Sequence, residues 1–504
     1  MKIKSLISLI LVLAIAAGLF AGCGGGSPSS GNDGKSAAET DAADAETPED
    51  VPEGNAGKTV YSAGYLPEVN YGGYEFRMVS ATGYENPILF AAVEEETGDT
   101  VADAVYKRNR IIEERYGIKF KQIGVAAWDN LTPLFQKSTK ADTDDFDLCM
   151  MISRDAWAMA LTGAVVPVNK LPHLNITQPW YAHDVNSHIT INNKLYFAYS
   201  DECLHMFASA LCIMFNKKLV EDFALENMYG LVNESKWTID KFFELSKVAA
   251  ADMDGDGIMT ETDRYGILSQ ADMFYPCFWV SSGIKTVSKD SDDLLIFTGD
   301  GEKLYNVLDK IYQNVFGGDK IYFDSFTDHA WADESRAFTR KQFENNLGLF
   351  LVAPVDNIPA LRAMETDFGI IPFPKYDEAQ EKYYSRVVDG WIYCVPSYAP
   401  NLERTSVVME ALAVESKNIT VPAYMDTALR TKYARDDDSQ DMLDIIHANR
   451  TMDLGDTFYM DPVRNIYVDV FRAKKDNFAS AVEKKTSSVD KQLQKANDAA
   501  LTLE

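Results

Sequence analysis

Residues 252–263 have the residue types and the spacing of a calcium-binding loop. Their sequence, DMDGDGIMTETD, places aspartates at positions 1, 3 and 5 of an EF-hand loop and Gly257 at position 6, where such a loop turns sharply. Position 12 is an aspartate, which is shorter than the usual glutamate. We expect a structural calcium ion here; the alternative is an Asp/Gly turn without an ion. The expected ligands are Asp252, Asp254, Asp256, the carbonyl oxygen of Ile258, Thr260 directly or through a water, and Asp263.

Acidic residues far outnumber basic ones along the chain. The 504 residues include 76 Asp and Glu against 48 Lys and Arg, which gives a net charge of −28. Nucleic acids and anionic membrane surfaces bind to clustered Lys and Arg, so we expect neither as a direct partner. Hydrophobic residues make up 46% of the chain, which is enough for a full globular core.

The first 23 residues indicate export from the cell. Lys2 and Lys4 precede the apolar run 6–20, which is short for a membrane-spanning helix. The stretch Phe20-Ala21-Gly22-Cys23 resembles the lipobox of bacterial lipoproteins, although that motif usually has Leu where Phe20 stands. The resemblance implies a signal peptide at 1–22 and a lipid on Cys23. A plain secretory signal and an uncleaved anchor are the alternatives.

The segment that follows the cysteine contains almost no large apolar residue. Residues 24–58 carry eight acids and two lysines. Such a composition cannot bury enough surface to offset chain entropy, so we expect a disordered acidic linker over 23–70. Lipid, linker and folded body together predict a protein anchored on the extracellular face of the cell membrane.

The other five cysteines have no regular spacing, which excludes a disulfide scaffold and a close-set zinc cluster. Each lies in an apolar run, so we expect buried thiols, with a disulfide between two of them as the alternative. These cysteines are Cys149, Cys203, Cys212, Cys277 and Cys394.

The folded body alternates strand and helix patterns. Residues 74–80, 118–123 and 145–152 read as strands, and 103–116 reads as an amphipathic helix that ends at Gly117. This alternation predicts an α/β fold with mainly parallel sheets. About 430 residues exceed one comfortable core, so we expect two lobes.

Several short stretches, in order along the chain, carry a family resemblance. They are AVYKRNR at 104–110, LYFAYSD at 195–201, MFNKKL at 214–219, KWTIDK at 236–241 and FGIIPFPK at 368–375. From about Tyr71 to the C-terminus the chain resembles extracellular solute-binding lipoproteins of bacterial ABC importers, of the sugar-binding type (family 1) related to maltose-binding proteins.

The resemblance implies a periplasmic-binding-protein-like fold, in which two hinge-linked α/β lobes close over a ligand in the cleft between them. Lobe 1 would hold residues 71–200 and 371–398, and lobe 2 residues 201–370 and 399–504. The implied function is capture of a carbohydrate, with an oligosaccharide favoured, by a monomer that delivers it to an ABC permease. No chemistry at the site is implied.

Sugar binding needs flat apolar faces for pyranose rings and planar polar groups for hydroxyls. Arg154 and Trp157 follow a predicted strand, and the carboxyl ends of such strands face the cleft in open α/β sheets. Asp201 lies at the first predicted crossing between lobes, and Asp389 lies in a turn that leads into a strand near the return crossing. For each candidate the alternative is a packing or surface role. The six candidates are Arg154, Trp157, Asp201, Trp279, Asp389 and Trp391.

The sequence leaves an enzymatic alternative open. It contains no HExxH, GxSxG or P-loop motif, which disfavours a metalloprotease, an α/β-hydrolase or an NTPase. Glycoside hydrolysis needs only two carboxylates in a cleft, and 76 acids offer many pairs. A secreted glycoside hydrolase is therefore the second hypothesis, and a surface-adhesion or peptide-binding module the third.

Overall fold

The structure is a computed structural model, and it describes residues 59–83, 91–318, 320–324, 332–425 and 436–503. The predicted signal peptide, Cys23 and residues 24–58 of the acidic linker lie outside these residues. The linker was expected to extend to residue 70, but residues 60–70 pack on the folded body, because Ala63 and Leu66 are buried and Tyr61 N donates to Asn418 Oδ1 at 2.9 Å. The chain divides into two units, Met1–Thr59 and Val60–Glu504, and the description below concerns the second. Among its described residues, no helix has the length and apolar character needed to cross a membrane.

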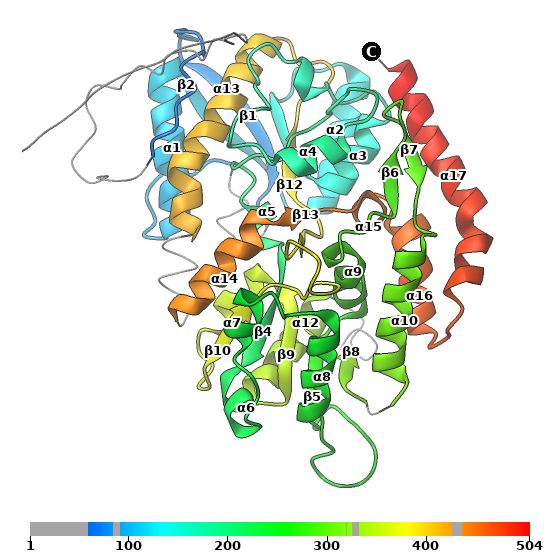
Figure 1. Cartoon of the computed structure of the whole chain (residues 1–504). Coiled ribbons are helices and arrows are strands. Elements are labelled where there is room, and N and C mark those ends of the chain that lie inside the picture. The colour runs from blue at the N-terminus through cyan, green and yellow to red at the C-terminus, as the bar shows by residue number, and fades with distance from the viewer. Residues whose placement is uncertain (1–58, 84–90, 319, 325–331, 426–435, 504) are drawn as a thin grey trace, which may run out of the picture. The chain divides into compact units, whose positions relative to one another are not determined.

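The first sheet has four strands in the order β12-β3-β1-β2 (Figure 1). Strands β2 and β3 pair with β1 in parallel, and β12 returns antiparallel to β3. Every residue of β3, LCMMI, is buried, as expected for a strand with both faces covered. The strands are β1 (Tyr74–Ala81), β2 (Ile118–Val125), β3 (Leu148–Ile152) and β12 (Trp391–Cys394).

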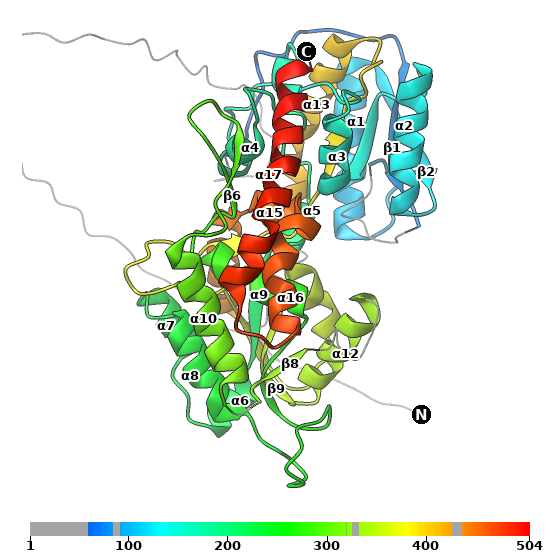
Figure 2. The same ribbon diagram turned by 90° about the vertical axis from the view of Figure 1, so that its right-hand side faces the viewer.

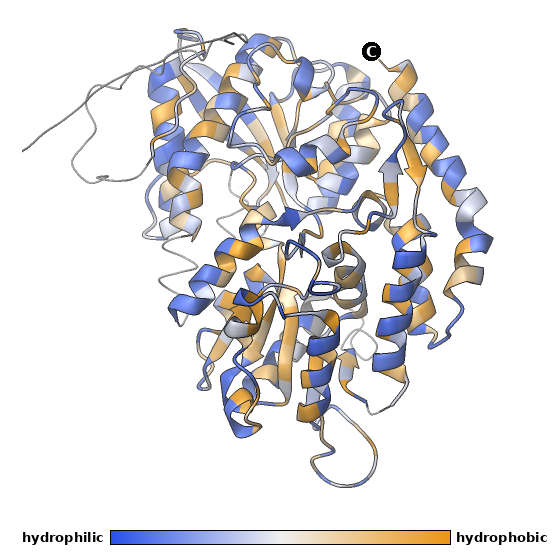
Figure 3. Ribbon diagram, viewed as in Figure 1, coloured by the Kyte–Doolittle hydropathy of each residue, from blue (hydrophilic) through white to orange (hydrophobic). Residues whose placement is uncertain are grey.

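The second sheet has five strands in the order β10-β4-β9-β5-β8. Its central strand β9, GLFLVAP, is buried throughout, pairs in parallel with β5 and pairs antiparallel with β4. Figure 3 shows the strands of both sheets mainly in hydrophobic colours, while the helices outside them carry one polar face. The strands are β4 (Leu211–Asn216), β5 (Tyr265–Ser269), β8 (Tyr322–Asp324), β9 (Gly348–Pro354) and β10 (Phe368–Ile371).

Helices cover both sheets. Local signals explain their ends: Asp99 caps the first helix by accepting from Val101 N and Ala102 N, and Gly117 ends it at φ 59°. Beside the first sheet lie α1 (Thr100–Tyr116), α2 (Leu131–Ala141), α3 (Ser153–Ala160), α4 (His183–Ile189), α13 (Leu402–Glu415) and the π-helical η5 (Ser416–Thr420). Beside the second lie α6 (Lys217–Asp222), α7 (Met228–Asn233), α8 (Ile239–Ala249), α9 (Ala271–Ser281), α10 (Glu302–Phe316), α12 (Ala332–Glu344), α14 (Asp437–Ala448) and α16 (Asn465–Arg472).

Short elements complete the fold. They are the hairpin β6 (Val287–Lys289) and β7 (Leu295–Phe297), the paired strands β11 (Ser385–Arg386) and β13 (Arg450–Thr451), the helices α5 (His205–Ala208) and α15 (Leu454–Thr457), the 3-10 helices η2 (Trp128–Asn130), η3 (Val168–Lys170) and η4 (Val355–Leu361), and the π-helical η7 (Met460–Arg464). The last helix, α17 (Phe478–Thr502), is the longest of the described elements.

The predicted lobe boundaries need two corrections. Residues 399–425 were expected in lobe 2, but α13 packs on α1, and Arg404 pairs with Asp147 at 3.2 Å. Residues 371–390 were expected in lobe 1, but β10 pairs with β4, and Pro372 O accepts from Trp237 Nε1 at 2.9 Å. The chain therefore rejoins the first sheet only at β12. Both lobe assignments follow from contacts between segments that are far apart in the sequence, and hydrophobic periodicity carries no information about such contacts.

The chain passes between the sheets at 201–210 and again at 384–390. These two passages meet, because Ala210 and Val387 form a bridge and Val387 N donates to Thr451 O in β13 at 2.9 Å. The C-terminal helix also spans both sides (Figure 2). Asn497 of α17 bonds to Leu295 of the hairpin, and Ala500 O accepts from Lys194 Nζ at 2.8 Å.

The expectation of buried thiols is confirmed for the described cysteines. All five lie in the interior, and none of them forms a disulfide in the described structure. Burial raises the pKa of each thiol, so these side chains act as small apolar groups.

Candidate functional site

Polar and aromatic side chains gather where strands of the first sheet end. Trp128 begins η2, just after β2, and is 36% exposed. Arg154 and Asp155 lie in the first turn of α3, which follows β3 directly. The guanidinium carbon of Arg154 lies 5.1 Å from the Trp128 ring centroid, and Arg154 Nε lies 3.5 Å from Asp155 Oδ1. The carboxyl ends of these strands therefore present an indole beside one guanidinium group and one carboxyl group.

Asp389 joins this edge from the segment that leads into β12. Its backbone carbonyl accepts from Ser209 Oγ at 2.8 Å, and its carboxylate Oδ1 lies 3.8 Å from Nδ1 of His205. The next residue is glycine because the backbone passes close to a ring: a Cβ at Gly390 would lie 2.5 Å from Tyr199 Cε1. Asp389 is thus fixed between the first sheet and the passage at 201–210.

Electrostatic coupling shows that these acids share one environment. Burial raises the pKa of Asp155, the Arg154 guanidinium opposes this rise, and the charge of Asp389 adds to it. From the second sheet, Asp356 follows β9 at the start of η4. Burial also raises the pKa of Asp356, and Arg336 and His205 oppose that rise.

Together these residues form what we call the inter-sheet cluster, since they come from the carboxyl ends of strands in both sheets and from the passage between them. An exposed indole face can stack on a flat apolar ring face, and the guanidinium and carboxyl groups can bond to hydroxyls. The cluster comprises Trp128, Arg154, Asp155, His205, Asp356 and Asp389.

Two of the predicted ligand residues, Arg154 and Asp389, lie in this cluster. The three predicted tryptophans lie in packed surroundings. Trp391 is 8% exposed at the start of β12. Trp157 is 3% exposed and stacks on Phe458, with centroids 5.2 Å apart. Trp279 is fully buried in α9.

Hydrogen bonds hold two of these indoles. Trp157 Nε1 donates to Tyr459 Oη at 3.3 Å, and Trp279 Nε1 donates to Asp453 Oδ2 at 3.3 Å. Buried indole N–H groups usually need such acceptors, so both residues have the surroundings of packing residues in this conformation.

Asp201 lies in a pocket at the passage between the sheets. It is 7% exposed, and its Oδ2 lies 3.1 Å from Lys417 Nζ. The predicted polar residue at the crossing is therefore present, but its surroundings differ from those of Arg154 and Asp389.

Sequence reasoning missed Trp128, Asp155, His205 and Asp356. A signal existed for Trp128, because it follows the predicted strand 118–123 within a few residues, as Arg154 follows its own strand. No comparable signal existed for His205, whose position depends on a passage between remote segments.

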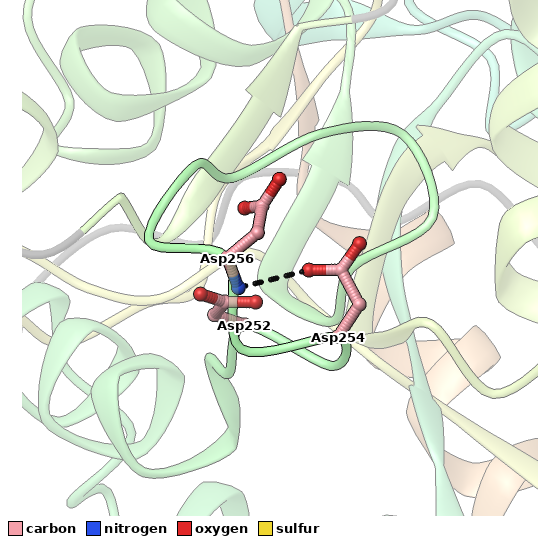
Figure 4. Close-up of side chains that lie close together, drawn as sticks. All are labelled: Asp252, Asp254 and Asp256. Carbon is pink, nitrogen blue, oxygen red and sulfur yellow. Dashed lines mark hydrogen bonds between the residues drawn. The ribbon is translucent and has the colours of Figure 1, made fainter.

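The calcium-like loop has the expected shape (Figure 4). One carboxylate oxygen each from Asp252, Asp254 and Asp256 lies within 4.8 Å of the other two. Asp254 Oδ1 accepts from Asp256 N at 3.1 Å. Gly255 and Gly257 have φ angles of 74° and 80°, which residues other than glycine rarely adopt.

Asp263 closes the loop from within. Its Oδ1 accepts from Met253 N at 2.7 Å, and its Oδ2 accepts from Thr260 N at 2.6 Å. These bonds to the charged form lower the pKa of Asp263. Asp252 also binds the loop backbone, because its two carboxylate oxygens accept from Gly255 N and Gly257 N at 2.7 Å each. The donor set is made of hard oxygens and suits calcium.

Solved structures of sugar-binding proteins share this fold. A cyclo/maltodextrin-binding protein complexed with maltotetraose matches with a TM-score of 0.58 at 12% identity, over 83% of this chain and 97% of that chain. An extracellular solute-binding protein from Staphylococcus aureus in complex with maltose matches with a TM-score of 0.56 at 12% identity, over 83% and 98%. A sugar transporter from Rhizobium etli in an open conformation matches with a TM-score of 0.53 at 13% identity, over 85% and 100%.

These likenesses show the fold and confirm the predicted two-lobed α/β architecture. Nearly the whole length of each of those proteins is covered, so the likeness is not confined to one lobe. No protein-family model matches the sequence, and no curated protein matches it.

Proposed function

We propose that the protein is an extracytoplasmic solute-binding protein that captures a carbohydrate, favouring an oligosaccharide, for an ABC transporter. The observation that carries this proposal is the inter-sheet cluster, in which an exposed indole lies beside the Arg154–Asp155 pair at the carboxyl ends of strands in the first sheet, and Asp356 follows a strand of the second sheet. The named ligands of the similar structures, maltotetraose and maltose, agree with that chemistry.

Capture would work by a shift between open and closed forms. Trp128 and Arg154 belong to the first sheet, and Asp356 belongs to the second. A ligand that bonds to both sets favours the form in which both are in reach, and it can shift the equilibrium only by that difference in affinity. Micromolar binding needs about −8 kcal/mol in total, which one or two stacked rings and several hydrogen bonds supply.

A thermal-shift screen over mono- and oligosaccharides, followed by calorimetric titration of the hits, tests the proposal. We expect a raised melting temperature with at least one oligosaccharide, and weaker binding by Trp128→Ala and Arg154→Ala. Lys310→Gln is a matched control, because Lys310 is also part of an ion pair but lies on α10, outside the cluster. Absence of any sugar-induced shift across the screen would contradict the proposal.

The second candidate function, glycoside hydrolysis, is favoured by one observation. Asp155 has a raised pKa beside the charge of Asp389, and hydrolysis needs one protonated and one ionised carboxyl group. Incubation with oligosaccharides and analysis of the products separates the two functions. Turnover that is lost in Asp155→Asn would establish the hydrolase, whereas intact sugar after long incubation supports the binding protein.

For localisation, we propose that the protein is a monomer held at the outer face of the cell membrane through a lipid on Cys23, with the permease as its membrane partner. The lipobox-like stretch 20–23 and the acidic composition of 24–58 support this. Metabolic labelling with a fatty acid should mark the wild type and not Cys23→Ser. Equal labelling of both would refute the anchor.

We also propose that residues 252–263 bind a structural calcium ion. The convergence of three carboxylates within 4.8 Å supports this. The loop joins α8 to β5, an internal strand of the second sheet, so an ion there would stabilise that connection rather than act on the ligand. Bound calcium should be measurable by elemental analysis of the purified protein.

A further inference from the structure

A second polar pocket lies beside the passage at 201–210, and we call it the crossing pocket. Its volume is about 420 Å³, within the range of small-molecule sites. Its walls come from the start of α4, the passage itself, α5, η5, and the junction of α14 with β13. The residues that matter below are His183, Asp201, Phe207, Lys417, His447 and Arg450.

Arg450 is the most unusual group in this pocket. Its guanidinium carbon lies 3.7 Å from the centroid of the Phe207 ring, so the cation is stacked in place. Its Nε and Nη1 are buried and have no hydrogen-bond partner among the residues that the structure describes. Burial lowers the pKa of Arg450 to about 10, so the group remains a cation at neutral pH.

The other charges that face the pocket give Arg450 only a shared counter-charge. The charge of Asp201 opposes the lowering of the Arg450 pKa, but Asp201 Oδ2 also lies 3.1 Å from Lys417 Nζ. Asp184 and His183 approach from α4, and His447 from α14. Among the described residues, no carboxylate forms an ion pair with Arg450. Guanidinium N–H groups that are buried without an acceptor are costly, and an acceptor group from a ligand would relieve that cost.

We propose that the crossing pocket binds a small hydroxylated carboxylate of the sugar-acid class. The carboxylate would accept from the Arg450 guanidinium and lie near the Lys417 ammonium. The hydroxyl groups would meet the polar rim that Asp201, His183 and His447 supply. A neutral sugar of the same skeleton leaves the guanidinium uncompensated, so the charge sets the selectivity.

Calorimetric titration with matched probes tests this site. D-glucuronate and D-glucose differ in whether C6 is a carboxylate, and acetate offers the carboxylate without hydroxyl groups. We expect the wild type to bind glucuronate, with glucose and acetate at least tenfold weaker. Arg450→Gln and Lys417→Gln should each weaken glucuronate by about tenfold or more, the loss of one charge-assisted hydrogen bond.

Two controls keep the outcome decisive. Lys310→Gln removes an ion-paired lysine from α10 and should bind glucuronate as the wild type does. Trp128→Ala, in the inter-sheet cluster, should also retain glucuronate binding, which separates this pocket from the proposed sugar site. Lys417 is 28% exposed in its side chain, so its variant tests the site even if Arg450→Gln fails to fold.

Three results would overturn the proposal. They are no glucuronate binding to the wild type at millimolar concentration, equal binding by the wild type and Lys417→Gln, and loss of binding in Trp128→Ala. The first two remove the crossing pocket as a carboxylate site, and the third moves glucuronate to the inter-sheet cluster. None of these results depends on whether an oligosaccharide binds elsewhere.

Discussion

Removal of the Trp128 indole gives the sharpest test of the inter-sheet cluster. A large aromatic side chain offers roughly 150–250 Å² of surface, so the 36% that Trp128 exposes is roughly 80 Å². Covering that area with a sugar ring contributes about 2 kcal/mol at about 25 cal/mol per Å². Stacking geometry adds about 0.5–1 kcal/mol, by analogy with aromatic pairs. Trp128→Ala should therefore weaken ligand binding by about 2.5–3 kcal/mol, or about 60- to 150-fold.

The same substitution should leave the fold almost unchanged. Trp128 lies in a short turn at the surface, and its described ring contact with Arg154 is worth about 0.5–1 kcal/mol at an exposed site. We expect the melting temperature of the ligand-free protein to fall by at most about 4 °C. The substitution should thus lower the affinity for the ligand while leaving the stability of the fold nearly unchanged. This combination distinguishes a residue that contacts the ligand from one that packs in the core.

The assay is calorimetric titration with the best oligosaccharide from the thermal-shift screen. Trp128→Phe is the matched control, because it keeps an aromatic face and should stay within about tenfold of the wild type. An affinity of Trp128→Ala within threefold of the wild type would refute the reasoning. In that case the indole does not touch the ligand, and the cluster loses its only described exposed tryptophan.

Three further predictions concern stability. EDTA should lower the melting temperature of the wild type but not of a variant with Asp252, Asp254 and Asp256 all changed to Asn; an unchanged wild-type melt with no bound metal would exclude the ion. Burial raises the pKa of Glu202 from 4.5 to about 8. Between those pH values the folded state holds a proton that the unfolded state releases, so the free energy of unfolding should fall by about 1.4 kcal/mol per pH unit as pH rises. Urea titrations from pH 5 to 8 should show a free energy of unfolding that depends less on pH in Glu202→Gln than in the wild type. Trp391 is 8% exposed, so Trp391→Ala should lower the free energy of unfolding by about 3–5 kcal/mol in the same titrations, and a loss below 1 kcal/mol would contradict its packing role.

Local signals allowed the first sheet to be predicted well. The predicted strands at 74–80, 118–123 and 145–152 overlap β1, β2 and β3, because apolar runs bounded by a glycine or polar turn carry that information within a few residues. Gly117 separates helix from strand in a left-handed conformation that glycine accepts without strain.

Lobe membership could not be predicted in the same way. Residues 399–425 belong to the first sheet's side because Glu410 accepts from Trp180 Nε1 at 3.0 Å and from Tyr181 Oη at 2.6 Å, more than 200 positions earlier in the chain. Such contacts depend on which faces meet after folding. Neither the hydrophobic period nor the composition of α13 distinguishes one sheet from the other.

The exposure of the aromatic residues could not be predicted for a related reason. Indole rings are suited to stacking on sugar rings, but the composition of the chain does not indicate which tryptophans remain exposed after folding. Trp157 and Trp279 find partners about 302 and 174 positions away, in Tyr459 and Asp453. Trp128 remains 36% exposed, because it lies just after the carboxyl end of β2, at the surface of the first sheet.

The passages between the sheets explain why the cluster residues can act together. Arg386 in β11 makes a bidentate ion pair with Asp456, at 2.6 and 2.8 Å, and both side chains are buried. With the β11–β13 pairing and the bridge from Ala210 to Val387, this pair ties the described passages into one block. His205 and Asp389 lie at the edges of that block, whereas Trp128 lies on the first sheet. Under the proposed function, a ligand that bonds to all three is sensitive to the position of the first sheet relative to the block. Its difference in affinity between the open and closed forms is then the free energy available to hold the closed form.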